Sequence, residues 1–462
     1  MKRGGRVGSR PGRTATVRAM AAVAGVVALA WLAAGPGHAQ VVPIPIEEAR
    51  LANGFRIVVS TDRSTPIVAV NLRYGVGSGH EAPGRTGFAH LFEHLVFQGT
   101  ENLADGELER MVTDAGGVLN GRTNTDRTEY TELVPAHHLD RIIWSHAERM
   151  RRLVVTEEGF ARQREVVKEE RRLRVDNTPY GEARITIDTL AQDYPPYDHS
   201  VVGSMEDLNA ASVSDVRAFH DRWYRPANAT LVVVGDTSLE EVLPMVERWF
   251  GGFDAGPEPD PLPPPPTGPR QDGERRADLD DPRAQLPLTY VAFAMPPAGH
   301  PDLPALRVVN RILASGQNSR LYRRLVADRG VATQVFGQVE ARFGSGLFLI
   351  GALSGPGVEQ ASTEAAIHAE VGRLVADGPS RAEVEGVVNQ LRAAGAMELS
   401  TVAGRARAIQ EAIAVRGDPS SVAVEAASLA SVTAADAHRV ARRWLVTANR
   451  AVVVARPTEA GR

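Results

Sequence analysis

An internal repeat constrains the fold of this chain more than any other feature of its sequence. Residues 215–235 (DVRAFHDRWYRPANATLVVVG) align without gaps with residues 436–456 (DAHRVARRWLVTANRAVVVAR), at a constant offset of 221 residues. Each copy has apolar residues at helical spacing, then a Trp and an Asn, and then an apolar run. The pattern predicts a helix, a turn and a buried strand that occur twice. It therefore indicates two similar domains of roughly 200 residues each.

Length and composition agree with two folded domains. The chain has 462 residues, 43% of them hydrophobic, and its 43 Gly and 30 Pro stay below the share that is typical of low-complexity sequence. A Pro-rich stretch at 257–269 lies between the two copies and is typical of a semi-rigid spacer. We therefore predict one domain over residues 46–253, a Pro-rich linker over 254–283 and a second, homologous domain over 284–457.

The order of the elements expected in the first half favours an α+β fold. Alternating and β-branched patterns predict strands at residues 55–60, 67–76, 118–123 and 128–133. Apolar residues at helical spacing predict helices at 87–98, 105–115, 137–155, 156–175 and 212–223. Because strands and helices do not alternate strictly, we expect helices packed on a mainly antiparallel sheet.

Charge and cysteine content exclude several classes of function. The net charge of -4 and the pI near 6.3 give no basic surface, so we expect no nucleic acid partner. The chain has no cysteine, which excludes a disulfide framework, a thiol nucleophile and a cysteine-ligated metal. Any metal site must therefore use His, Asp or Glu side chains.

The amino terminus has the pattern of a targeting segment. Within residues 1–39, Lys and Arg occur only at positions 2–18. An uncharged run at 19–34 follows, before the small residues of Gly37-His38-Ala39. This order predicts a signal peptide over residues 1–39 and an exported, periplasmic protein. An uncleaved leader would act as a tether, and we expect no transmembrane span in the mature chain. A mitochondrial presequence is the alternative, although such presequences interleave their basic and apolar residues.

The chemistry-bearing motif lies at residues 90–94, within the helix expected at 87–98. His90 and His94 are four positions apart, so both imidazoles project from one face and can share a metal ion. Glu93 projects beside them. The rest of the helix is largely apolar, which predicts burial, and an unpartnered buried polar group costs roughly 1 to 3 kcal/mol. A bound metal would supply the missing partner.

A third ligand is expected from the helix at 156–175, which offers Glu165, Glu169 and Glu170. Glu170 follows apolar residues by three and four positions and precedes another by three, so it shares the apolar stripe. Glu165 and Glu169 fall on a charged face that is typical of solvated residues. We therefore predict that Glu170 points inward, toward the histidines.

With these residues identified, the chain resembles the inverzincin metallopeptidases, the family of pitrilysin, insulysin and the mitochondrial processing peptidase, in which the motif reads H-x-x-E-H. The resemblance extends over residues 46–457. It includes the segments around the motif and a stretch of the second half: Gly77-Ser78-Gly79-His80-Glu81, Gly84-Arg85-Thr86-Gly87, Phe97-Gln98-Gly99-Thr100, residues 120–130 and residues 316–325. The family's third ligand lies about 76 residues after the second histidine, which is Glu170 here.

The resemblance implies an architecture and a cofactor. Two homologous α+β domains would form a clamshell around a chamber for an extended peptide, and the first domain would bind zinc through His90, His94 and Glu170. The second half has no H-x-x-E-H motif, and its corresponding helix reads LRVVN at residues 306–310. The resemblance therefore implies one Zn²⁺ per chain.

The resemblance also implies an activity, which is endopeptidase cleavage of peptides or unfolded polypeptides. A zinc-activated water would attack the peptide bond, with Glu93 as the general base that passes the proton to the leaving amine. Substrates of this family bind by strand addition to a sheet edge, and residues 118–123 match that edge. Asn120 in this strand is the expected substrate-binding residue, with a simple turn role as the alternative.

Two departures from the family pattern bear on partners. Gln163 stands where many members carry an assisting glutamate, so its role is in doubt. Val326 and Thr333 stand where active single-chain members carry a substrate-binding Arg and Tyr. We therefore expect a heterodimer in which a homologous subunit supplies that pair. A homodimer or monomer that binds substrate through its backbone, a catalytically inactive scaffold, and a peptide-binding subunit remain as alternatives.

Overall fold

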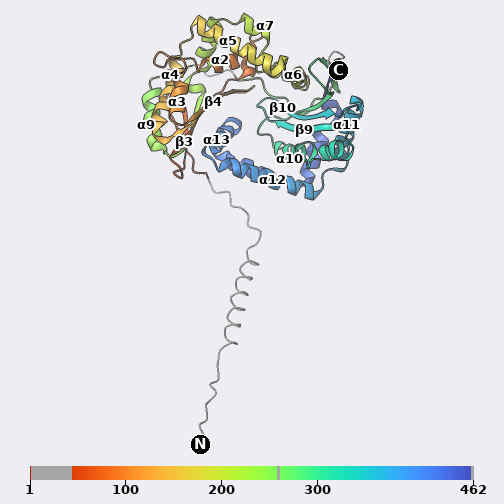
Figure 1. The fold of residues 1–462 in the computed structure, drawn as a ribbon. Coiled ribbons are helices and arrows are strands. Elements are labelled where there is room, and N and C mark those ends of the chain that lie inside the picture. Colours follow the sequence, from red (N-terminus) through yellow and green to blue (C-terminus); the bar gives the residue numbers. More distant parts are fainter. Residues whose placement is uncertain (2–43, 257–260, 459–462) are drawn as a thin grey trace. The chain divides into compact units, whose positions relative to one another are not determined.

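The structure, a computed structural model, describes residue 1 and residues 44–256 and 261–458. In these ranges it is an α+β protein with two β-sheets and helices packed against them (Figure 1), as the sequence predicts. Apart from its first residue, the predicted signal peptide at 1–39 lies outside the described residues. Within the described ranges, no helix combines the length and the apolar character that a membrane crossing requires.

The first sheet has six strands in the order β1-β2-β6-β3-β5-β4. Their bounds are β1 (Glu47–Arg50), β2 (Arg56–Thr61), β3 (Ile67–Tyr74), β4 (Val118–Thr123), β5 (Thr128–Pro135) and β6 (Ala229–Gly235). Only the β2–β6 pair is parallel, so the sheet is mainly antiparallel. β6 is buried along its whole length because β2 and β3 flank its edges and apolar clusters cover both faces of the sheet.

Helices cover one face of this sheet and close a large apolar core. The helices of the first half, all but α6 on the side of this sheet, are α2 (Phe88–Leu95), α3 (Glu107–Asp114), α4 (Leu139–Arg151), α5 (Glu157–Arg171), α6 (Gly181–Leu190), α7 (Met205–Ala210), α8 (Val213–Trp223) and α9 (Leu239–Phe250). Leu72 and Val233 of the sheet pack in one cluster with Phe92, Ile143 and Phe250 of the helices. This cluster holds the motif helix α2 against the sheet.

The second sheet repeats the topology of the first. Its five strands follow the order β7-β11-β8-β10-β9, and their bounds are β7 (Arg275–Asp281), β8 (Leu288–Met295), β9 (Ala332–Glu340), β10 (Gly346–Ser354) and β11 (Arg450–Pro457). The single parallel pair is β7–β11, which corresponds to β2–β6. The helices are α10 (Leu303–Leu313), α11 (Gln360–Asp377), α12 (Arg381–Leu399), α13 (Val402–Arg416), α14 (Val422–Ala430) and α15 (Ala434–Trp444).

The repeated sequence folds into the same local structure twice. α8 leads into β6 and α15 leads into β11, and both helices begin with a capping box. In the first copy Asn228 Nδ2 donates to the Trp223 carbonyl at 2.8 Å, and in the second Asn449 Nδ2 donates to the Trp444 carbonyl, also at 2.8 Å. The predicted helix, turn and buried strand are therefore present at both positions, with the same side-chain hydrogen bond closing the turn.

One predicted boundary is wrong. β7 lies inside the segment 254–283 that the sequence analysis assigned to the linker, so the second sheet begins at Arg275. The strand is at the edge of the sheet, and its alternate residues are exposed, which explains its charged sequence RRADLDD. Ala277 and Leu279 are its half-buried apolar residues, and they pack against an apolar cluster.

The two halves exchange one helix each. α6 of the first half packs on the second sheet, where Ala183 and Ile187 join a cluster with strand residues such as Leu349. α13 of the second half packs on the first sheet, where Ile409 and Ile413 join a cluster with residues of β2, β3 and β6. Figure 1 shows α13 beside β3, and α6 above β10. Each sheet therefore has its second face covered by a helix from the other half.

A polar contact also joins the halves. The Tyr197 hydroxyl donates to Asp126 in the turn between β4 and β5, and it accepts a hydrogen bond from the Gly344 backbone at 2.8 Å. The Phe343 backbone N–H donates to the other carboxylate oxygen of Asp126 at 3.1 Å. The loop between β9 and β10 is thereby tied to the turn that follows β4.

Candidate metal centre

Helix α2 places both histidines of the motif. Leu91 and Phe92 are buried on its core side, and His90, at 9% exposure, is nearly as buried as they are. His94 is half-buried one turn later. The predicted burial of this helix is confirmed, and its two imidazoles lie on one face, with their Nε2 atoms 3.4 Å apart.

Helix α5 places Glu170 near its end. Thr156 caps the start of the helix by accepting a hydrogen bond from the Gly159 N–H. The inward face consists of Phe160, Gln163, Val167 and Glu170, whose spacing follows the helical period.

Glu170 faces the histidines as predicted, but two of its expected apolar neighbours are exposed. Val166 and Leu173, which the sequence pattern assigned to the buried stripe, are 45% and 61% exposed. Glu165 and Glu169 are exposed, as expected, and pair with Lys168 and Arg172 on the surface. Val167 alone of the expected apolar neighbours is buried.

The three candidate ligands converge on one point. Glu170 Oε2 lies 3.2 Å from His94 Nε2 and 3.7 Å from His90 Nε2, and the donor atoms of the three residues all lie within 4.8 Å of one another. Ligand atoms around a tetrahedral zinc lie roughly 3.3 Å apart, given metal–ligand distances of about 2.0 to 2.1 Å. The donor set therefore fits zinc in both chemistry and spacing. In residues 44–256 and 261–458 it is the one group of this kind.

Burial and nearby charge favour the protonation states that metal ligation needs. Burial and, to a lesser extent, the neighbouring His94 lower the pKa of His90 to about 4, although Glu170 opposes this shift. The hydrogen bond with His94 is the largest cause that lowers the pKa of Glu170, and Arg174 contacts the same carboxylate at 2.6 Å. A neutral imidazole and an ionised carboxylate are both able to bind a cation.

Glu93 lies beside these ligands against the edge strand β4. Its carboxyl is largely buried, and burial raises its pKa, with a hydrogen bond from Thr123 opposing that rise. Its Oε2 atom is buried and has no hydrogen-bond partner among the described residues. A Cβ atom at Gly121 would lie 2.8 Å from Glu93 Oε1, so the absence of a side chain there makes room for the carboxylate.

The structure separates Asn120 from the other predicted site residues. Val118, Asn120 and Arg122 are the exposed residues of β4, whereas the residues between them face inward. β4 is the last strand of its sheet and pairs on one side with β5, with Asn120 opposite Thr131. No other strand within the described ranges pairs with its outer edge. The strand thus has an edge that is open to strand addition.

Some residues around the site were not assigned a role from the sequence. Gly121 and Thr123 contact Glu93, and Arg174 contacts Glu170. Arg174 follows Glu170 by four residues, so helical spacing was a signal for that pair. Sequence spacing gave no signal for the contacts of Glu93 with β4, because strand and helix are joined only by tertiary packing.

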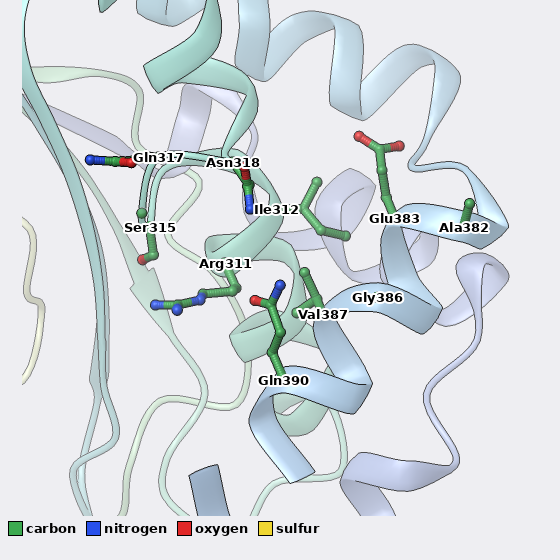
Figure 2. Close-up of a pocket in the computed structure, with 11 residues that line it drawn as sticks. Arg311, Ile312, Ser315, Gln317, Asn318, Ala382, Glu383, Gly386, Val387 and Gln390 are labelled. Atoms are coloured by element: carbon green, nitrogen blue, oxygen red, sulfur yellow. The ribbon is translucent and has the colours of Figure 1, made fainter. Parts of the chain in front are cut away.

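A pocket elsewhere in the second half does not add to this centre. It has a volume of about 230 Å³ and lies between the end of α10 and the start of α12, where Figure 2 shows polar side chains around it. Glu383 on its rim is neutralised by Arg320, with N–O distances of 2.7 and 2.8 Å. Arg311 belongs to the last turn of α10, where a cation stabilises the carbonyl end of a helix. None of the candidate ligands lines it.

Comparisons with known protein families match both halves of the chain. A family model described as Insulinase (Peptidase family M16) matches residues 56–190, and one described as Peptidase M16 inactive domain matches residues 210–391. The candidate ligands lie in the first match, and the second match begins after them.

Relatives and solved structures extend the likeness along the chain. "Zinc protease PqqE" of Helicobacter pylori (strain ATCC 700392 / 26695) is 32% identical over 349 residues, which are 75% of this chain and 79% of that protein. The crystal structure of a protease from Helicobacter pylori has a TM-score of 0.84 at 28% identity and covers 90% of this chain and 100% of its own. The periplasmic protease PqqL from Escherichia coli shares the fold, with a TM-score of 0.72 at 16% identity over 91% of this chain and 48% of its own. The chain therefore belongs to the insulinase family of peptidases, family M16.

Proposed function

We propose that this chain is a zinc-dependent endopeptidase that cleaves peptides or unfolded polypeptides. One zinc ion per chain would be held by His90, His94 and Glu170. The observation that carries the proposal is the convergence of these three donors beside a buried Glu93 and an open sheet edge. The names of the zinc protease relatives support the same chemistry.

The metal ligands, Glu93 and the edge strand β4 have separate roles in the proposed reaction. Zinc bound there would supply Lewis-acid chemistry, which lowers the pKa of water toward 7 and polarises a peptide carbonyl. Glu93 would accept the proton of the attacking water and deliver it to the leaving amine, and a pKa raised by burial suits a base that works near neutral pH. The edge of β4 would hold the substrate in extended form through backbone hydrogen bonds, with Asn120 beside it.

The proposed enzyme is exported and periplasmic, as its leader pattern indicates. It is one subunit of a heterodimer, because the expected Arg and Tyr of the second domain are absent. Val326 lies in the π-helical turn η6 (Tyr322–Asp328) and packs against the core, and Thr333 is exposed on β9. A homologous partner subunit would supply the missing pair.

A second candidate is a catalytically inactive scaffold or a peptide-binding subunit. The same absence at Val326 and Thr333 favours it, together with the match of residues 210–391 to a domain described as inactive. Against it stands the full set of donors in the first half, because a scaffold has no need of three converging ligands and a buried carboxyl.

The test compares matched glutamine variants by metal analysis and peptide digestion. Glu170→Gln should lose bound zinc, whereas Glu169→Gln on the exposed face of the same helix should keep it. Glu93→Gln should keep zinc and lose peptide hydrolysis by about 10²-fold to 10⁴-fold, the range for a general acid–base residue. Zinc lost from Glu169→Gln alone would show that the ligand is misassigned. A zinc-loaded Glu93→Gln variant with full activity would remove Glu93 from the mechanism.

A further inference from the structure

A buried carboxylate that the proposed mechanism does not use lies at the start of the metal-binding helix. Glu81 follows the short 3-10 helix η1 (Ser78–His80), and its side chain has no exposed surface. Its two carboxylate oxygens accept hydrogen bonds from the backbone N–H groups of Gly87 at 2.8 Å and Ala89 at 2.7 Å. The carboxylate thus contacts the chain one residue before His90.

Helix α2 depends on an acceptor from outside its own sequence. Its N-cap residue is Gly87, which has no side chain and adopts a left-handed conformation with φ of 88°. The first N–H groups of a helix have no partner within the helix, and a side-chain oxygen or an anion at that end stabilises it. Glu81 meets this requirement from six residues upstream of the cap.

Glu81 is itself held by His199, from a distant part of the chain. His199 Nε2 lies 3.1 Å from Glu81 Oε2 and 3.0 Å from the Ser78 carbonyl, and Nδ1 lies 3.0 Å from Asp198. Both ring nitrogens face oxygen acceptors, so both must carry a proton to satisfy them, and the ring is then a cation. His199 thereby holds Glu81 in a mostly buried ion pair.

A buried charge without a partner is strongly destabilising, and even a paired one contributes little stability compared with apolar packing. Stability alone therefore does not explain this arrangement. Three side chains of α2, namely His90, Glu93 and His94, must be held close to their working positions, because a shift of about 1 Å at a catalytic group costs on the order of 10²-fold in rate. A fixed first turn provides that control.

We propose that Glu81 is a positioning residue for the metal centre, acting through the backbone of α2 and held in place by His199. The proposal rests on the proposed function, and it adds a specific requirement: the acceptor must be a carboxylate. A glutamine would keep one acceptor oxygen but would direct its NH₂ group at a backbone N–H. One of the two hydrogen bonds to the start of α2 would therefore be lost.

The experiment compares Glu81→Gln with a matched surface variant, Glu101→Gln, in the zinc-loaded full chain. Zinc affinity is measured by competition with a chelator, and kcat and KM are measured separately at saturating zinc. We expect Glu81→Gln to fold and to lose zinc affinity or kcat by about 10-fold to 100-fold, as for groups that orient metal ligands, with KM changed by less than about 3-fold. Glu101→Gln should match the wild type.

Hydrogen exchange of the Gly87 and Ala89 amides directly reports the two hydrogen bonds that Glu81 accepts. These amides should be protected in the wild type and should exchange at least about 10-fold faster in Glu81→Gln. If Glu81→Gln does not fold, His199→Gln replaces it, because its amide still donates to Glu81 while the charge is lost, and a smaller change in the same direction is expected. Unchanged zinc affinity, kcat and amide exchange in these variants would overturn the proposal.

The outcomes separate this proposal from the proposed function. A wild-type chain that binds zinc but cleaves no peptide would contradict the peptidase assignment. The zinc affinity of Glu81→Gln would still test the positioning role of Glu81. A drop in melting temperature with unchanged kcat and zinc affinity would show that Glu81 only stabilises the fold, which contradicts a positioning role.

Discussion

At the scale of single residues, the candidate base depends on a neighbour that has no side chain. Gly121 of β4 faces Glu93, and a Cβ atom there would lie 2.8 Å from the carboxylate oxygen and 2.9 Å from both Glu93 Cγ and Phe97 Cε2. Distances this short force the Glu93 side chain to move. The site thus requires glycine for space, since Gly121 does not have a positive φ.

Replacement of this glycine tests the placement of Glu93. We expect Gly121→Ala to bind zinc normally, because the ligand side chains are not displaced, and to lose kcat/KM by about 10-fold to 100-fold. The measurements are steady-state peptide cleavage and zinc content. Gly252→Ala, where an added Cβ meets open space, is the control. Equal kcat/KM for the wild type and Gly121→Ala would show that Glu93 is not confined by β4.

His199 makes stability depend on pH. Burial opposes its charge, but hydrogen bonds to Glu81 and Asp198 outweigh burial and raise its pKa from 6.5 to about 9. A group with a raised folded-state pKa stabilises the fold fully below its unfolded pKa and loses that effect as the pH rises through the folded value. The stabilisation is therefore present below pH 6.5 and lost as the pH passes about 9.

The measurement is urea denaturation of the metal-free protein at a series of pH values. The free energy of unfolding of the wild type, minus that of His199→Gln, should be largest just below pH 6.5 and should fall toward pH 9 and above. It should also fall in acid, where Glu81, whose pKa is raised by burial, becomes protonated. Glu81 and Asp198 are the charged groups that face the ring, so both must be ionised for the effect. A difference that stays constant over this range would show that His199 is not charged in the folded state.

At the scale of elements, the exchanged helices join the two halves into one folding unit. α13 carries Val402, Ala406, Ile409 and Ile413 on one face, at helical spacing, and this face covers the first sheet. Gln410 beside them is fully buried and donates to the Thr230 carbonyl at 3.0 Å. The helix is therefore as much a part of the first sheet's core as of its own half.

A cavity in this helix should destabilise the whole chain. Ile409→Ala removes a fully buried side chain, and we expect it to lower the free energy of unfolding by about 2 to 5 kcal/mol. Arg407→Ala, on the exposed face two residues earlier, should cost about 1 kcal/mol or less. Chemical denaturation of both variants checks the difference. Equal costs would contradict the packing of α13 on the first sheet.

At the scale of the whole molecule, the two halves differ in the functional residues that they carry. The first half has the candidate metal ligands, and the second half lacks the Arg and Tyr expected to bind substrate. The first half brings together His90, His94, Glu170 and Glu93. In the second half Val326 packs into the core, where it has no polar atom to offer a substrate. The chain therefore carries a candidate metal centre but not the polar pair expected in its second half.

The proposed heterodimer predicts that a partner chain raises the peptidase activity. We expect that mixing this protein with a homologous chain that lacks H-x-x-E-H but carries the Arg and Tyr raises peptide cleavage by about 10-fold or more, with a heterodimer seen by size-exclusion chromatography. The same partner with its Tyr replaced by Phe is the matched control and should activate less. Full activity of this chain alone, unchanged by any partner, would contradict the heterodimer and leave the metal centre unaffected.

The sequence alone determined the features that depend on local spacing. The repeat at residues 215–235 and 436–456 predicted the units α8-β6 and α15-β11, because helix period, capping and a turn at Asn are encoded within about 20 residues. The i, i+4 spacing placed His90 and His94 on one face for the same reason. The strand at 118–123 was predicted with the bounds that the structure shows.

Only the tertiary structure decided the features that join distant segments. β7 has too little apolar sequence to be recognised as a strand, and it exists because β11 offers it a parallel edge. The exchange of α6 and α13 follows from which sheet face each helix can cover, a choice that no local pattern encodes. His199 reaches Glu81 across 118 residues of sequence. Contacts at such separations depend on how the whole chain packs. The sequence therefore identified the candidate ligands, and the folded chain determined the surroundings that hold them.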